Sequence, residues 1–181
     1  RAQDSVLESV LNQAGLSVPQ IDLVELYSCF PCVPKMAQRS LQMAKDRAIS
    51  VTGGLTFFGA PLNNYMTHAI AATVLRLRVK PSACALVYGQ GEFVTKHHAI
   101  VLGGGARPWL GEAPAPERTT ANVVKTNAPA IDPDASGSVR VETGTVLFDR
   151  AGMPTHGVVV GRTADNARTL ARVPASDLRS I

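Results

Sequence analysis

The chain has 181 residues, of which 45% are hydrophobic, and a formal net charge of +4; these values predict one globular domain or two small ones and argue against a largely disordered chain. Its longest apolar run, over residues 69–77, contains Thr73 and Arg76 and is shorter than the roughly 20 residues of a membrane-spanning helix, so no span is expected. The basic residues are dispersed with few aromatic neighbours, which favours a mildly basic surface or a phosphate-bearing small ligand over nucleic acid.

The first part of the chain alternates helical and strand patterns. Residues 4–14 predict an amphipathic helix that Gly15 ends, and the apolar segment 22–27 predicts a short strand. A second helical pattern begins at Pro34. A strand that leads into a helix is typical of α/β proteins, so we expect an α/β fold here.

A glycine-rich segment follows, Val51-Thr-Gly-Gly-Leu-Thr-Phe-Phe-Gly-Ala-Pro-Leu62. Its glycines allow positive φ or a close approach of the backbone to a ligand, and its proline fixes the chain before the next element. Taken alone, a glycine pair is most often a simple turn. Its place before a long helical pattern, residues 65–79 with Asn63 or Asn64 as N-cap, predicts a recognition loop instead.

Two strands are predicted next, over residues 83–88 and 95–102, and the turn-rich segment 89–92 between them is so short that antiparallel pairing is favoured. Residues 106–136 then carry several prolines and no sustained periodicity, which predicts a linker. The α/β part is therefore placed at residues 1–105.

Residues 137–181 have an all-β pattern. Alternation over residues 139–147, a turn at 149–152 and the apolar runs 158–160 and 169–173 predict a three-stranded meander. Three strands make a marginal core, so this is expected to be a small β module.

The order helix, Asp22-Leu-Val-Glu-Leu-Tyr-Ser-Cys-Phe-Pro31, helix, Gly53-Gly-x4-Gly-Ala-Pro61, long helix and two adjacent strands resembles the C-terminal half of the thiolase superfamily. The resemblance implies a partial C-terminal thiolase half-domain with a mixed sheet and helices. The family's other half-domain carries the nucleophilic cysteine and has no counterpart here. Because the chain also begins with Arg1 rather than Met, we expect a fragment.

The string Tyr27-Ser-Cys-Phe-Pro31 and the triplet Asn63-Asn-Tyr65 after the glycine loop look like a subgroup commonly labelled acetyl-CoA acetyltransferase. Some members of that subgroup carry an extra C-terminal β domain similar to oligonucleotide/oligosaccharide-binding (OB) barrels. The resemblance therefore implies that the β module is OB-like.

The resemblance also assigns catalytic positions. Tyr27 stands where a thiolase has the Asn or His that holds a water in an oxyanion hole, and Ala60 stands where it has the histidine of Gly-His-Pro. Tyr88 falls near the family's acid/base cysteine, and no cysteine is found there. Loss of a hydrogen-bond donor and of a proton-transfer group should abolish ordinary thiolase turnover, unless Tyr27 or Tyr88 supplies the hydrogen bond that Ala60 cannot.

The same resemblance implies a substrate-binding set around the thioester: Phe30, Gly53, Gly54, Gly59 and Pro61. The implied function is that of a fragment of a thiolase-like acetyl-CoA acetyltransferase in lipid metabolism. The parent would bind acyl-CoA for acyl transfer or for Claisen-type carbon–carbon bond formation or cleavage, and this chain alone would be inactive.

The expected partners are acyl-CoA and the missing N-terminal half-domain, and a homo-oligomer stays open. No cofactor is expected beyond the coenzyme A thioester as substrate, and no metal. The main alternative is a non-catalytic module that binds coenzyme A, a lipid or, through the β tail, nucleic acid.

Cys29-Phe-Pro-Cys32 supports a minor alternative, a thiol redox protein, because the pair lies between a strand and a helix. Zinc binding with Cys84 and a histidine is less favoured, because the second pair lacks ligand spacing. His97 and His98 are consecutive on a strand, so one should face inward and one solvent. Three cysteines are too few for a disulfide framework, which favours a cytoplasmic location.

Overall fold

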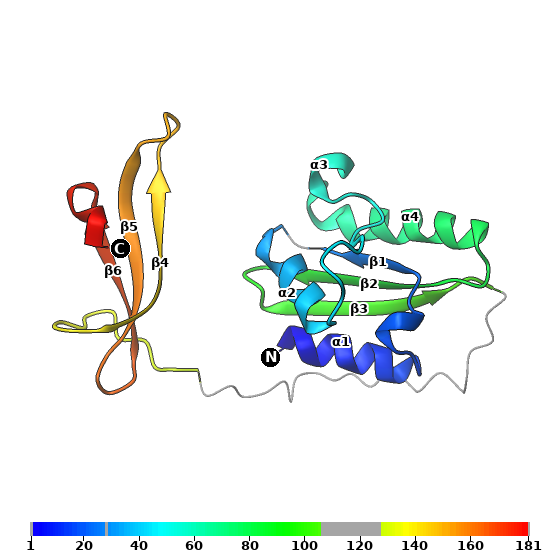
Figure 1. The fold of residues 1–181 in the computed structure, drawn as a ribbon, viewed down its shortest axis with the longest axis horizontal. Helices are drawn as coiled ribbons and strands as arrows, with labels where there is room; N and C mark the ends of the chain where they lie inside the picture. Colours follow the sequence, from blue (N-terminus) through cyan, green and yellow to red (C-terminus); the bar gives the residue numbers. More distant parts are fainter. Residues whose placement is uncertain (1, 28, 106–127, 181) are drawn as a thin grey trace. The chain divides into compact units, whose positions relative to one another are not determined.

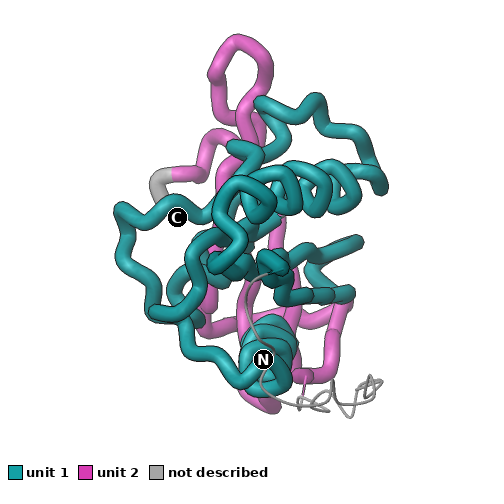
Figure 2. Tube along the Cα trace, turned by 90° about the vertical axis from the view of Figure 1, so that its right-hand side faces the viewer, with its two compact units in different colours: residues 1–124 teal, residues 125–181 magenta. Residues whose placement is uncertain are grey.

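A computed structural model describes residues 2–27, 29–105 and 128–180. The chain divides into two compact units, residues 1–124 and 125–181, which Figure 2 colours separately. The first unit combines a mixed sheet with helices, and the second contains an all-antiparallel sheet. The predicted fold class, α/β followed by a small all-β module, is confirmed. Among the described residues, the helices lack the length and apolarity needed to cross a bilayer.

The α/β unit follows the predicted order of elements closely. It consists of α1 (Ala2–Gln13), β1 (Leu23–Leu26), α2 (Cys32–Ser40), α3 (Leu55–Phe58), α4 (Tyr65–Val79), β2 (Cys84–Gly91) and β3 (Lys96–Gly103). The short helix α3, inside the glycine-rich segment, was not predicted. The segment 89–92, expected to be a turn, mostly continues β2, and the turn lies at residues 92–95.

The sheet of this unit has the order β1-β2-β3. Strand β3 is antiparallel to β2, as predicted, and β1 is parallel to β2. Figure 1 shows α1 on one side of the sheet and α4 on the other. Residues 84–90 of β2 are all buried, which is the pattern of a central strand covered on both faces.

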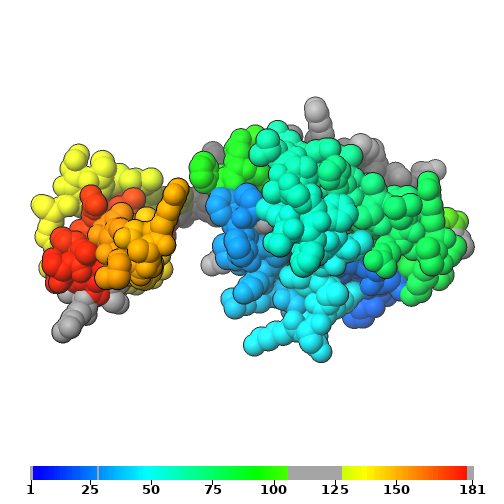
Figure 3. Space-filling model, turned by 90° about the horizontal axis from the view of Figure 1, so that it is seen from above, coloured from blue at the N-terminus to red at the C-terminus, as the bar shows by residue number. Residues whose placement is uncertain are grey.

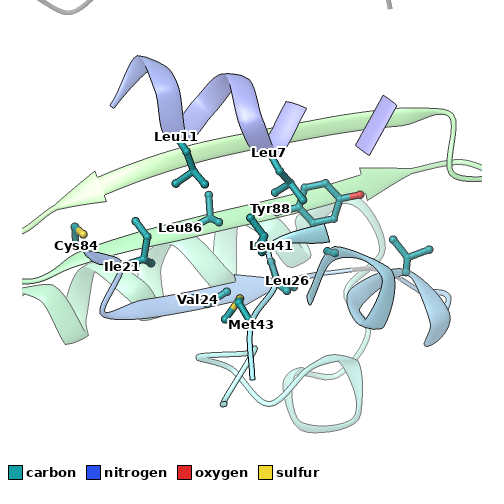
Figure 4. Close-up of a cluster of buried hydrophobic side chains, with 12 residues drawn as sticks. Leu7, Leu11, Ile21, Val24, Leu26, Leu41, Met43, Cys84, Leu86 and Tyr88 are labelled. Atoms are coloured by element: carbon teal, nitrogen blue, oxygen red, sulfur yellow. The ribbon is translucent and has the colours of Figure 1, made fainter. Parts of the chain in front are cut away.

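Successive side chains of a strand point to opposite faces, so each face of the sheet has its own core. On the face towards α1 and α2, Val24 and Leu26 of β1 join Leu86 and Tyr88 of β2 in the cluster drawn in Figure 4. On the other face, the buried residues Ala83, Ala85 and Leu77 of α4 form a smaller cluster.

Helix α4 spans Tyr65–Val79, as predicted, although its predicted cap is not formed. Asn64 occupies the N-cap position with a helical backbone and makes no capping hydrogen bond. Its side-chain nitrogen instead lies 2.9 Å from Nε2 of His68, one turn along the helix. The position of α4 therefore depends on packing, through a buried stripe at Tyr65, Ala69, Thr73 and Leu77.

The second unit is a meander of β4 (Arg140–Phe148), β5 (Pro154–Arg162) and β6 (Arg168–Pro174), followed by a 3-10 segment, Ala175–Ser180. Arg168 exchanges backbone hydrogen bonds with Ala130 and Asp132, so the end of the segment expected to be a linker pairs with β6. Residues 106–127 of that predicted linker lie outside the described residues. An OB-like barrel stays a prediction.

Candidate functional site

The glycine loop, residues 53–61, has the backbone that its sequence predicts. Gly53 has φ 85° and Gly54 has φ 90° with ψ −172°, a region that is essentially restricted to glycine. A Cβ on Gly53 would lie 2.8 Å from Cδ2 of Phe57. The loop therefore needs both glycines for its shape.

The glycine loop lies at the end of the sheet where the parallel strands finish. The amide of Leu26, the last residue of β1, donates to the carbonyl of Ile49, just before the loop, over 2.8 Å. Figure 1 shows α2 and the turn between β2 and β3 at one end of the sheet, with α3 beyond the start of α4. The carboxyl ends of parallel strands are where α/β proteins commonly bind ligands.

Tyr27 lies beside the base of the glycine loop. Its ring stacks on that of Tyr65 with centroids 4.2 Å apart, and the Tyr65 hydroxyl is hydrogen-bonded to Thr52, which precedes Gly53. The Tyr27 hydroxyl makes no hydrogen bond to the described residues. Burial, and then the charge of nearby Cys29, raises the pKa of Tyr27. It therefore stays protonated at neutral pH and can donate a hydrogen bond.

Tyr88 lies on the opposite face of the sheet from Tyr27, because the register pairs it with Leu26 rather than with Tyr27. Its hydroxyl is held by Gln3 Nε2 at 3.1 Å and by His97 Nδ1 at 2.8 Å, and burial raises the pKa of Tyr88. Phe30 packs against the same core cluster. The structure thus brings Tyr27 to the glycine loop. It places Tyr88 in the core cluster under α1 and α2 (Figure 4), and Phe30 packs against that cluster.

The rest of the glycine loop presents apolar surface. Phe57 is 77% exposed, and Leu62, directly after the loop, is 87% exposed. Ala60 and Gly59 are exposed, and Pro61 is partly exposed. Ala60 also has a positive φ of 45°. Besides Tyr27, the exposed Thr56 is a side-chain donor of the loop, and the rest of this surface offers mainly apolar contact.

Two residues near the loop were missed by the sequence analysis. His68 of α4 lies edge-on to Phe58 of the loop, with ring centroids 6.1 Å apart. Glu25 is buried in β1 and accepts hydrogen bonds from residues just before the loop. The signal for Glu25 was an acidic residue between Val24 and Leu26 in an apolar strand.

The cysteines and the paired histidines occupy separate places. Cys29 and Cys32 are free and exposed, whereas Cys84, at the start of β2, is buried and donates to the carbonyl of Gln20. Within the described ranges there is no group of three or more His, Cys, Asp or Glu side chains able to hold a metal ion. His97 is bonded to Tyr88 and Val94 while His98 is exposed, which confirms the predicted alternation.

Comparison with known proteins agrees with this arrangement. Residues 119–180 match the family described as the thiolase-like protein type 1 additional C-terminal domain. The crystal structure of a monomeric SCP2-thiolase like protein type 1 from Mycobacterium smegmatis is similar over 94% of this chain, with a TM-score of 0.79 and 30% sequence identity. The chain spans 37% of the length of that protein. A search of curated proteins found no match.

The two matches overlap, because the structural match extends over 94% of the chain. The structural match includes the α/β unit with the glycine loop, and the family match covers most of the β unit. The resemblance to the thiolase superfamily, and the extra C-terminal β domain that it implied, are confirmed. The chain is therefore similar to thiolase-like proteins, and its residues 119–180 match the additional C-terminal domain of the type 1 group.

Proposed function

We propose that the α/β unit forms the glycine-loop side of an acyl-CoA site, in a thiolase-like protein whose reaction class is acyl transfer or Claisen-type carbon–carbon bond formation or cleavage. One observation carries the proposal: the glycine loop and Tyr27 meet at the carboxyl end of the parallel strands. The exposed side chains of Phe57 and Leu62 give the loop apolar surface for an acyl chain.

Tyr27 is the group that we propose donates a hydrogen bond to the thioester oxygen. Ala60 stands where the family has a histidine and cannot donate. The Tyr88 hydroxyl is already held by Gln3 and His97 on the other face of the sheet. Tyr27 is protonated near neutral pH, because the ordinary pKa of a tyrosine is 10.0 and burial raises that of Tyr27 further. A single neutral donor supports recognition of the thioester more strongly than turnover.

A second half-domain is the partner that we propose for the outer side of α4. Leu75 lies opposite the buried stripe of α4 and is 60% exposed, next to the exposed Arg78, and Val79 at the end of the helix is 86% exposed. Figure 3 shows the segment from the glycine loop through α4 facing the viewer. Exposed apolar side chains on the outer side of a helix are suited to packing against a second layer.

The exposed free thiols of Cys29 and Cys32 support a cytoplasmic location.

Calorimetry with acetyl-CoA tests the acyl-CoA site, and the variant Gly54→Ala tests its dependence on the loop. A side chain at Gly54 forces a conformation restricted to glycine, at a cost of about 1–3 kcal/mol. We therefore expect affinity for acetyl-CoA to fall about tenfold, since each 1.4 kcal/mol is a factor of ten. Tyr27→Phe, which keeps the ring stack, should weaken binding of the thioester but not of free coenzyme A.

Gly105→Ala is the matched control, because Gly105 has no positive φ and an added Cβ would meet nothing within 4 Å. It should bind acetyl-CoA as the unchanged chain does. Absence of acetyl-CoA binding by both the chain and the full-length protein that contains it would remove the proposal. Binding without any turnover of acetoacetyl-CoA by the full-length protein would favour the non-catalytic alternative. The presence of Ala60 in place of the family's histidine donor also supports that alternative.

A further inference from the structure

Glu25 is a buried carboxyl group that the proposed site does not yet use. It lies in the middle of β1, its side chain faces α4, and it is 1% exposed. A carboxylate inside a protein is costly unless hydrogen bonds or an opposite charge compensate the lost hydration. No basic side chain among the described residues pairs with it. Its compensation must therefore come from hydrogen bonds.

Those hydrogen bonds all come from the chain that leads into the glycine loop and from α4. The amides of Val51 and Thr52 donate to Oε2 over 2.7 and 3.0 Å, and the Ser50 hydroxyl lies 3.0 Å from the same oxygen. The Tyr65 hydroxyl donates to Oε1 over 2.9 Å. Both carboxylate oxygens thus face donors. An ionised carboxylate accepts them all, whereas a protonated or amide group would turn a hydrogen towards one of them.

A further layer of hydrogen bonds connects this carboxylate to the glycine pair. The amide of Gly53 donates to the Ser50 hydroxyl over 2.9 Å, and the amide of Gly54 donates to the Thr52 hydroxyl over 3.0 Å. Ser50 passes its own hydrogen on to Glu25. Both glycine amides therefore already donate hydrogen bonds within the chain and are not available to a ligand.

The same carboxylate also holds the aromatic pair beside the loop. Tyr65, which donates to Glu25, provides the ring on which Tyr27 stacks, with an angle of 22° between the ring planes. One buried group thus connects the base of the glycine loop with the ring that carries the proposed donor.

We propose that Glu25 is a positioning residue: its carboxylate, through Ser50, Val51, Thr52 and Tyr65, holds the glycine loop and the Tyr27 ring in their relative places. This inference rests on the proposed function only in naming acyl-CoA as the ligand of the loop. The hold on the loop itself is a property of the chain and can be measured without ligand.

The test is amide hydrogen exchange on the full chain and on Glu25→Gln, which keeps the shape but turns an NH₂ group towards the donors. Loss of a charged hydrogen bond is large enough that we expect exchange at residues 51–54 to accelerate about tenfold or more. Exchange in α1 and in β4 to β6 should not change. Ser50→Ala is a milder second variant, and it should release the amide of Gly53 more than that of Val51.

Spectroscopy of Tyr65 and ligand binding provide readouts that a general loss of stability would not reproduce. Burial first, and then the charge and hydrogen bond of Glu25, contribute to raising the pKa of Tyr65 to about 12, so Glu25→Gln should lower it. Acetyl-CoA affinity should fall in the same variant. Thr73→Val is the matched control, because Thr73 is equally buried on α4 but bonds only to its own helix, at the carbonyl of Ala69.

Loop amides that exchange as slowly in Glu25→Gln as in the unchanged chain would overturn the inference. So would equal acceleration in Thr73→Val, since the effect would then reflect general destabilisation. If the unchanged chain binds no acetyl-CoA while Glu25→Gln still loosens residues 51–54, the acyl-CoA proposal fails and the positioning role of Glu25 stands. Loosened loop amides with unchanged acetyl-CoA affinity would overturn the role of Glu25 in that site.

Discussion

The sheet of the α/β unit and the sheet of the β unit differ in how they are covered. In the first, residues 84–90 of β2 are buried along their whole length, between α1 and α2 on one face and α4 on the other. In the second, Val159 and Ala167 are the buried hydrophobic residues of the described part, and β4 has no fully buried residue. The comparison teaches that strand pairing alone does not make a core, because a sheet needs a second layer.

In the β unit, polar contacts between the strands compensate in part for the missing core. Glu142 of β4 accepts hydrogen bonds from Arg162 of β5 and from Arg168 of β6, so one carboxylate connects all three strands. Phe148 and Leu170 remain 62% and 67% exposed. This difference between a covered and an open sheet leads to three predictions, each of which would be contradicted if the two sheets responded alike.

The largest effect is expected from Leu86→Ala in β2. Leu86 is 1% exposed in the main core cluster, so the cavity should cost about 2–5 kcal/mol in the free energy of unfolding of the α/β unit. Leu170→Ala in β6 removes an exposed leucine and should stay within about 0.5 kcal/mol. Denaturant unfolding followed by the amide NMR signals of each unit measures both. A cost for Leu170→Ala as large as that for Leu86→Ala would show that the β sheet is covered in solution.

The next largest effect is expected on the stability of the α/β unit at alkaline pH, because all three tyrosines of the chain belong to that unit. Burial is the main cause that raises the pKa of Tyr27, Tyr65 and Tyr88, that of Tyr65 to about 12 from 10.0. The fold favours the protonated phenol, so the stabilisation is fully present below pH 10 and is lost as pH rises towards 12.

We therefore expect the phenolate absorbance of the folded chain to rise at higher pH than in concentrated guanidinium. The α/β unit should unfold in that range before the β unit, which has no tyrosine. A folded chain whose three tyrosines all titrate as in the denatured chain would contradict the buried network around Tyr65 and Tyr88.

The smallest effect is expected from Glu142→Gln in the β unit. The hydrogen bond from Arg162, followed by that from Arg168, holds the pKa of Glu142 below its usual value. Its contribution is therefore present above the unfolded pKa and is lost as pH falls through the folded value. Because these ion pairs lie at the surface of the unit, with Arg168 45% exposed, we expect a small loss that added salt reduces. Thermal unfolding of the variant and of the unchanged chain at low and high salt measures this loss of stability. A large loss that does not depend on salt would show that polar contacts hold the β unit together as firmly as a core does.

Much of the fold could be predicted from local patterns. Helical periodicity placed α1 and α4, alternation placed β4, and apolar runs placed β5 and β6. The glycine pair indicated the positive φ values of Gly53 and Gly54. Helix α3 could not be predicted, because four residues between glycines have no helical periodicity. The capping role expected of Asn64 was also not found, since its side chain contacts His68 instead.

The candidate site was predicted less completely than the fold. Sequence and resemblance pointed to Tyr27 and Tyr88 together, but strand alternation and register put them on opposite faces of one sheet. Glu25 is 27 residues from Thr52 and 40 residues from Tyr65 in the sequence, so no local pattern could pair them.

The sequence by itself determined the order of elements, the glycine loop and the absence of a donor at Ala60, because these depend on residue type and local backbone preference. Only the tertiary structure decided that Tyr27 reaches the glycine loop. It also decided that Glu25 forms hydrogen bonds with the residues that precede the loop and with Tyr65. The physical reason is that burial and hydrogen bonding between distant segments are set by how strands and helices pack together.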